Sequence, residues 1–298
     1  GGTEIKYSVM DEQMHRTDSG AVPTPQDTQA QFLDAVYRLY APHKDEVTGI
    51  AMALPGFVDN RTGYVSNGGV LLFNTATPVG QLLTEKCSCP VILENDGKAA
   101  AMAELANGAL KSCCNAAVFI IGTGVGGGII ANGQLVRGVH FTAGEYSFVN
   151  TNAEAWDAPD QNMACQCSTS NLLKWYRARK ALPEDAPLDG RSFFDAANAA
   201  EPEALEVLER FCKMVAVQIY NLTVLLDVEK VAIGGGISKQ PLLLESLRNA
   251  YDGLYASRAG QAYMEGLPRC QIVPCAFSSE ANQVGVAAAY FEAMQKKC

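Results

Sequence analysis

The stretch IIGTGVGGGIIANGQLVRG, residues 120–138, has an apolar run before a glycine loop and an Asn-Gly pair after it. Its glycines Gly122, Gly124 and Gly127 match the dinucleotide-binding spacing G-x-G-x-x-G, which requires a helix to begin inside the loop. Asn132-Gly133 instead predicts a tight β-hairpin. The stretch therefore predicts a strand, a glycine turn and a second strand, with backbone N–H groups of the turn available to grip a phosphate.

Segments typical of strands and of helices alternate along the chain, which predicts an α/β fold. Apolar runs expected to form buried strands are residues 47–56, 116–124, 229–238 (ending in a glycine loop) and 271–277. Helix-forming stretches are residues 24–40, 96–110, 201–227, 240–255 and 279–296. For the first helix we expect Thr24 as the N-cap, Pro25 at the first helical position, and an apolar face through Phe32, Val36 and Leu39.

Charge and composition exclude some classes of protein. The formal net charge is −9, whereas a protein that binds a phosphate backbone needs a basic face. The chain has no run of about 18 apolar residues, the length that would span a membrane. Its ten cysteines show no disulfide framework, so we expect reduced thiols in a cytoplasmic protein. The chain opens at Gly1 without a methionine, and whether residues are missing before it stays open.

Glycines gather in three places. The first group is residues 1–3, with Lys6 shortly after it; the second is residues 122–128, where Thr123 adds a hydroxyl; the third is residues 234–236. One glycine loop alone is as well explained by turns and close packing. Three loops, each next to an apolar strand, favour an ATPase in which two domains close over the nucleotide.

One acidic residue is placed for chemistry. In LENDGKAAAMAE, residues 93–104, Asp96 follows an apolar strand and opens a helix. Either Asn95 or Asp96 caps that helix, a contribution of about 1 kcal/mol. Asp96 also suits a general base, because phosphoryl transfer to an alcohol needs an acceptor for the hydroxyl proton. The two roles are compatible.

These motifs together resemble the ROK family of sugar kinases and sugar-responsive repressors, in the family's order and over essentially the whole chain. The matching stretches are GGTEIK, ALPGFVDNRTG, ENDGKAAAMAE, IIGTGVGGGIIANGQLVRG, AGE at 143–145 and AIGGGIS at 232–238. The resemblance implies the actin-like, ribonuclease H-like ATPase fold, with two α/β domains and an interdomain cleft. Residues 1–108 and 283–298 would form the first domain, with the sugar site, and residues 109–282 the second, with the adenosine site and the homodimer surface.

Carried over by position, the resemblance assigns roles to individual residues. Asp96 would be the catalytic base, and the sugar pocket would also be lined by Gly56, Asn95 and Glu145. The ATP phosphates would be gripped by Gly2, Thr3, Lys6, Thr123, Gly124 and Gly126. The third loop, Gly234, Gly235 and Gly236, would flank the adenosine. Phosphoryl transfer also implies Mg²⁺, which neutralises charge on the transferring group.

The chain departs from the family pattern at its zinc site. Over the family stretch G-E-x-G-H this chain has Gly144-Glu145-Tyr146-Ser147-Phe148, so the histidine is absent, and in the loop C-x-C-G-x-x-G-C-x-E only Cys165 and Cys167 remain. The third cysteine falls on Leu172 and the glutamate on Lys174. A structural zinc site needs four ligands, so we expect no zinc and regard the two cysteines as remnants. Lys98 also replaces the second Asn of the END motif.

The resemblance therefore implies an ATP- and Mg²⁺-dependent kinase acting on a primary hydroxyl of a hexose or hexoside. Zinc-less members similar to this chain include kinases for glucose-type sugars and for β-glucosides. Two alternatives stay open at this point: a non-catalytic sugar sensor, and a ROK-type transcriptional regulator whose DNA-binding segment is missing. The expected partners are a sugar and ATP, without nucleic acid or membrane. The sequence does not identify the sugar or the hydroxyl.

Overall fold

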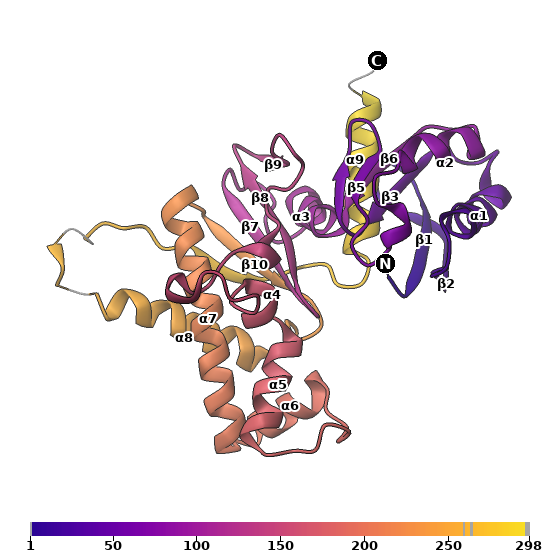
Figure 1. Ribbon diagram of the computed structural model, residues 1–298. Helices are drawn as coiled ribbons and strands as arrows, with labels where there is room; N and C mark the ends of the chain where they lie inside the picture. Colours follow the sequence, from indigo (N-terminus) through magenta and orange to yellow (C-terminus); the bar gives the residue numbers. More distant parts are fainter. Residues whose placement is uncertain (1, 259, 263–264, 296–298) are drawn as a thin grey trace. The chain divides into compact units, whose positions relative to one another are not determined.

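A computed structural model describes residues 2–258, 260–262 and 265–295 (Figure 1). Within these residues the chain divides into two compact units. Unit 1 holds residues 2–108, 135–143 and 279–295, and unit 2 holds residues 109–134 and those described between 144 and 278. The predicted assignment of binding roles to two domains stays a prediction.

Unit 1 contains three two-stranded sheets and the helices that pack on them. β1 (Glu4–Met10) pairs antiparallel with β2 (Arg16–Pro23), and β4 (Phe57–Asp59) pairs antiparallel with β5 (Tyr64–Asn67). β3 (Ile50–Leu54) pairs parallel with β6 (Val91–Asn95). The helices are α1 (Gln29–Tyr40), α2 (Val79–Cys87), α3 (Asp96–Asn107) and α9 (Ala281–Gln295), with 3-10 turns η1 (Ala41–His43) and η2 (Leu72–Asn74).

The first helix begins later than its sequence predicts. Its N-cap is Thr28, whose side chain accepts a hydrogen bond from the Gln31 N–H at 3.3 Å, and the predicted cap Thr24 is wrong. Thr24 instead donates its N–H to the Thr3 carbonyl at 2.9 Å. That bond extends the β1–β2 pairing by one residue. The backbone at Thr24 therefore continues the strand, whereas the sequence predicts the start of a helix there. The predicted apolar face is otherwise present, since Phe32 and Val36 are buried and Leu39 is half-buried.

Helices α3 and α9 pack side by side in unit 1 (Figure 1). Residues 97–104 of α3 are buried on all sides of the helix, and its alanines Ala99, Ala101 and Ala103 are fully buried. Gly285 of α9 lies so close to α3 that an added Cβ would clash with the Ala99 carbonyl. The pair is therefore held by close backbone approach, which requires glycine at this position.

Unit 2 is built on one five-stranded sheet with the order β11-β10-β7-β8-β9. Its strands are β7 (Ala116–Ile121), β8 (Val125–Ala131), β9 (Gln134–Val136), β10 (Lys230–Gly234) and β11 (Gln271–Pro274). β10 runs parallel to both β7 and β11, whereas β8 is antiparallel to β7. The Asn132-Gly133 turn between β8 and β9 has φ of 53° and 69°, the two positive values that a tight hairpin of this type needs. The predicted hairpin is confirmed.

The helices of unit 2 are α4 (Met163–Gln166), α5 (Thr169–Arg179), α6 (Gly190–Asn198), α7 (Pro202–Leu226) and α8 (Pro241–Ala256), with 3-10 turns η3 (Tyr146–Phe148) and η4 (Ala153–Ala155). The long α7, predicted as a core helix, packs against α8, α5 and α6 (Figure 1). Its buried side chains join those of the sheet, including Phe119, Ile121, Phe211 and Ile219, in one core. In the described ranges, no helix combines the length and the apolar character needed to cross a bilayer.

The close packing of α3 and α9 predicts opposite effects for one chemical change at two helical glycines. Gly285→Ala should lower the free energy of unfolding by about 1–3 kcal/mol, because the new methyl group meets backbone. Gly253→Ala in α8, where an added Cβ meets nothing within 4 Å, should raise it by about 0.5–1 kcal/mol. Urea unfolding followed by circular dichroism measures both. Equal effects of the two substitutions would contradict the packing.

Candidate functional site

The junction of β6 and α3 carries the predicted base. Asn95 is the N-cap of α3: its side-chain oxygen accepts the Lys98 N–H at 3.0 Å. Its side-chain nitrogen donates to the Gly56 carbonyl at 2.9 Å. Of the two candidates for the cap, Asn95 therefore takes the role, and Asp96 begins the helix with a carboxylate that is not needed for capping.

The Asp96 carboxylate is half-buried in the first turn of α3. Burial raises its pKa above the usual range of an aspartate, while the hydrogen bond from the Gly97 N–H at 2.9 Å and the charge of Lys98 act in the opposite direction. A carboxylate with a raised pKa is a better proton acceptor than a solvated one, provided that it is ionised at the working pH. This environment suits a general base.

Gly56 lies at the same edge of unit 1 as Asn95 and Asp96. Leu54 pairs with Asn95 in the parallel register, so β3 and β6 end together, and ligands in α/β proteins bind beyond such carboxyl ends. Gly56 has a φ of 89°, and an added Cβ would clash with the Asn67 carbonyl. Backbone conformation and close approach both require glycine here. The structure thus brings three of the predicted sugar-site residues together.

A buried ion pair lies directly before the predicted base, and no pattern in the sequence predicts it. Glu94, only 1% exposed, accepts hydrogen bonds from Arg137 Nε at 2.8 Å and from the Asn95 N–H at 3.1 Å. The Asn60 side-chain nitrogen lies 3.5 Å from the same carboxylate. The pair links residues 135–143 of unit 1 to the end of β6. Arg137 stands in the glycine-rich stretch that opens the sequence analysis, but nothing in its spacing names Glu94 as the partner.

Two predicted glycine loops lie next to each other in unit 2. The β7–β8 turn, Gly122 to Gly124, follows Ile121, and Gly235 follows the neighbouring β10. Gly235 has a φ of 98°, and an added Cβ would clash with the Ile121 carbonyl. At Gly122 and Gly236 an added Cβ would meet nothing within 4 Å, so there is open space beside both glycines. The Gly122 N–H itself donates to the Gly124 carbonyl at 3.0 Å, inside the turn. Open space beside a glycine turn is what a phosphate cradle needs.

The remaining predicted residues of unit 2 lie around these loops. Thr123 and Gly126 are exposed, at the turn and on β8. Glu145 is half-buried directly before η3, whose Tyr146 donates its hydroxyl to the Gly128 carbonyl at 3.1 Å. Glu145 therefore lies next to a residue that is hydrogen-bonded to β8, the strand that follows the glycine turn.

The first predicted loop also lies in unit 1. Gly2, Thr3 and Lys6 line a cavity of about 1010 Å³ between β1, β3 and α9. The Gly2 carbonyl accepts a hydrogen bond from the Gln26 side chain at 2.7 Å. Gly2 lies against Val70, whose neighbour Gly69 lies against Gly56, so this loop approaches the Gly56 end of the cluster.

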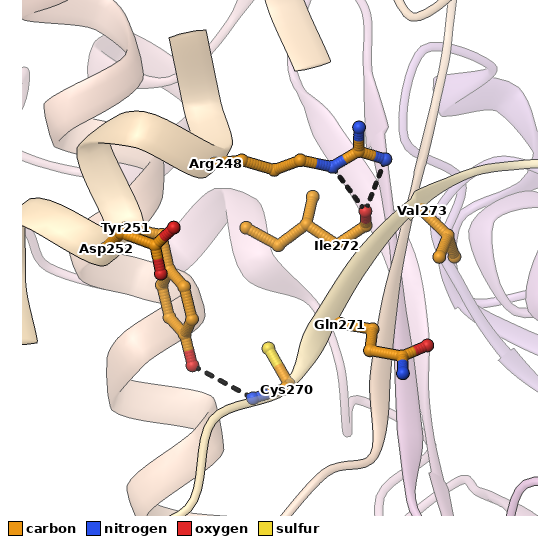
Figure 2. A pocket seen from close by; sticks show the side chains of 7 residues that line it. All are labelled: Arg248, Tyr251, Asp252, Cys270, Gln271, Ile272 and Val273. Carbon is orange, nitrogen blue, oxygen red and sulfur yellow. Dashed lines mark hydrogen bonds between the residues drawn. The ribbon is translucent and has the colours of Figure 1, made fainter. Parts of the chain in front are cut away.

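A second cavity, of about 360 Å³, lies in unit 2 between α8 and β11. Figure 2 shows Arg248 donating to the Ile272 carbonyl from Nε and Nη2, at 2.9 and 2.8 Å, and the Tyr251 hydroxyl accepting the Cys270 N–H at 3.2 Å. These polar groups bond to one another, and none of the predicted site residues lines this cavity. It is not part of the candidate site.

The two remnant cysteines do not form a zinc site with the side chains around them. Cys167 is fully buried, and burial raises the pKa of its thiol to about 12, although zinc binds the thiolate. Cys165 is half-buried. Among the residues that the structure describes, no group of three or more His, Cys, Asp and Glu side chains is placed to hold a metal ion. This donor set does not fit zinc.

Comparison with known proteins identifies the family. The ROK family profile matches residues 1–295. The chain belongs to the ROK family. A glucokinase of Halalkalibacterium halodurans is 30% identical over 267 residues, covering 80% of this chain and 79% of the glucokinase. A β-glucoside kinase of Listeria innocua is 28% identical over 251 residues, covering 84% of each chain.

A solved structure agrees with this membership. A ROK family protein of Streptococcus pneumoniae, in complex with sucrose, superposes with a TM-score of 0.86 at 26% identity, covering 99% of this chain and 97% of that one. The predicted family and the actin-like ATPase fold are confirmed. The kinases among the relatives support phosphotransferase activity for this ROK chain.

The Glu94–Arg137 pair makes a prediction about stability in this ROK chain. Arg137→Met should lower the free energy of unfolding by about 3 kcal/mol, because it leaves a buried carboxylate without its partner. Arg179→Met is the matched control: its pair with Glu206 is exposed on both sides and should contribute below about 1 kcal/mol. Arg137→Lys should recover part of the loss. If urea unfolding gives similar decreases in the free energy of unfolding for both methionine variants, the Glu94–Arg137 pair does not stabilise the end of β6.

Proposed function

We propose that this ROK chain is an ATP-dependent kinase that phosphorylates a primary hydroxyl of a hexose or hexoside, either a glucose-type sugar or a β-glucoside. The observation that carries the proposal is the Asp96 carboxylate, free of the capping role and half-buried at the carboxyl end of a parallel strand pair. Sugar kinase activity in general is supported by relatives named as kinases of glucose and of β-glucosides. The choice of sugar and the roles below are our proposal.

Asp96 accepts the proton of the sugar hydroxyl as that oxygen attacks the γ-phosphorus of ATP. An oxygen–phosphorus bond forms, the bond between the γ-phosphorus and the β–γ bridging oxygen breaks, and ADP leaves with the bridging oxygen. Asn95 and Gly56 hold the backbone on which Asp96 stands, and with Glu145 they line the sugar pocket. The proton moves from the sugar hydroxyl to a carboxylate oxygen, which is the role of a general base.

The glycine loops are the proposed ATP contacts. Thr123, Gly124 and Gly126 bind phosphate oxygens, Gly234 to Gly236 flank the adenosine, and Gly2, Thr3 and Lys6 add to the phosphate grip. The open space beside Gly122 and Gly236 supports this assignment. Mg²⁺ neutralises phosphate charge when bound and usually keeps several waters and few protein ligands, so it suits arrival with ATP. We expect a cytoplasmic homodimer, as the family resemblance implies.

The test is ADP release with ATP and Mg²⁺ across a panel of sugars. The panel contains glucose, mannose, fructose, N-acetylmannosamine, N-acetylglucosamine, cellobiose and an aryl β-glucoside. We expect turnover on glucose or on a β-glucoside, and Asp96→Asn should reduce kcat by at least about a hundredfold because the proton acceptor is lost.

The matched control is Asp45→Asn, which removes the same charge at an exposed position of unit 1 and should leave kcat unchanged. Full turnover in Asp96→Asn would remove Asp96 from the role of base. Silence of the wild type on every sugar, with the protein folded, would favour a non-catalytic sensor over a kinase.

The environment of Asp96 predicts a pH dependence. Only the ionised carboxylate accepts the proton, so kcat/KM should fall as the pH drops through the pKa of Asp96. Burial raises that pKa, and the acid limb should therefore lie above 3.8, the ordinary value of an aspartate. Rates measured at saturating MgATP from pH 8 down to pH 4 locate the limb. A flat profile over this range would contradict the raised pKa.

A further inference from the structure

Ser147 stands at the second glycine of the family pattern G-E-x-G-H, and its hydroxyl bonds the second glycine loop. Its Oγ accepts the Val125 N–H at 3.2 Å and donates to the Val125 carbonyl at 3.0 Å. The single donor of the hydroxyl and one of its two acceptor lone pairs thus go to one residue. Val125 is the first residue of β8 and closes the turn of Gly122, Thr123 and Gly124.

The same hydroxyl lies beside the turn itself. A Cβ added at Gly124 would come within 3.2 Å of Ser147 Oγ, so glycine lets the two approach. The turn is held on its other side by the Thr169 N–H, which donates to the Gly122 carbonyl at 2.8 Å. Hydrogen bonds from two separate segments therefore determine the conformation in which the N–H groups of this turn are presented.

The residue before Ser147 is held by burial, a hydrogen bond and ring packing. Its neighbour Tyr146 is buried, bonds the Gly128 carbonyl at 3.1 Å, and packs edge-on against Phe119 with ring centroids 4.5 Å apart. Gly127 of β8 has a φ of 148° and lies against this ring. Turn η3 therefore bonds β8 at two places. Tyr146 bonds Gly128 within the strand, and Ser147 bonds Val125 at its start.

We propose that Ser147 is a positioning residue, which holds the turn of residues 122–124 in the form that binds the β- and γ-phosphates of ATP. The inference rests on the proposed function. It gives the replaced family position a role on the nucleotide side, because the hydroxyl donates its one proton to the Val125 carbonyl and accepts the Val125 N–H, at the end of the glycine turn.

The experiment is nucleotide binding by titration calorimetry in the presence of Mg²⁺, with the non-hydrolysable analogue AMPPNP and with AMP as probes. Ser147→Ala removes both hydrogen bonds, and Ser147→Thr keeps the hydroxyl. The matched control is Ser257→Ala, which removes one hydrogen bond to a backbone carbonyl at the exposed end of α8, also in unit 2.

Ser147→Ala should weaken AMPPNP binding about tenfold and leave AMP binding within about twofold, because AMP has no β- or γ-phosphate. Ser147→Thr and Ser257→Ala should bind both nucleotides like the wild type. Equal weakening of AMPPNP and AMP in Ser147→Ala would overturn the proposal, since general damage to the nucleotide site gives that result. Unchanged AMPPNP binding would also overturn it, with the kinase assignment intact.

The failure of the proposed function has a different signature. A folded wild-type protein that binds neither nucleotide would refute the kinase assignment and the role of Ser147 together. Amide hydrogen exchange of the free protein adds a measurement without nucleotide. The Val125 amide should exchange faster in Ser147→Ala than in the wild type, and equal rates would show that the hydroxyl does not hold the turn.

Discussion

The hydrogen bond from the Asn95 side chain to the Gly56 carbonyl links the ends of two parallel strands, and the proposed sugar site depends on it. Because Asn95 also caps α3, one side chain sets the end of β6, the start of the helix and the position of the β3–β4 connection. Asp96 is the next residue, so its position is set by the same backbone geometry. The raised pKa of this proposed base is a consequence of burial.

The proposed nucleotide site takes its geometry from an antiparallel hairpin, β7–β8, and from the neighbouring parallel strand β10. Positive φ angles and close backbone contacts at Gly127 and Gly235 let these strands approach one another. The glycine loops contribute backbone dipoles and not charged side chains. Such dipoles suit a ligand whose charge is delocalised over several phosphate oxygens.

Local sequence signals predicted much of this arrangement. The hairpin at Asn132-Gly133, the core helix α7 and the strand before Asp96 all follow from turn chemistry and apolar periodicity. The N-cap of α1 was wrong because Thr24 has two available conformations, and the pairing of β1 with β2 selects the extended one. The residues near Thr24 do not indicate which distant segment of the chain they pair with.

The Glu94–Arg137 pair could not be predicted for the same reason. Forty-three residues separate the partners, and either charge alone is compatible with an exposed surface. The hydroxyl of Ser147 is a similar case, since the sequence shows a serine in place of the second glycine of G-E-x-G-H but not the bond that the serine makes. A substitution relative to a family pattern shows what is lost, and only the fold shows what replaces it.

The packing of α9 on α3 has a consequence for the order in which the protein matures during translation. Residues 2–108 of unit 1 are synthesised before unit 2, but α9, which packs against α3 at Ala99, is made only after all of unit 2. Unit 2 can therefore complete its core before α9 is available to α3. A nascent chain leaves the α9-facing surface of α3 uncovered for this interval, and such an apolar surface is prone to aggregation and is one that chaperones shield. Unit 1 thus begins synthesis before unit 2 but completes its packing after it.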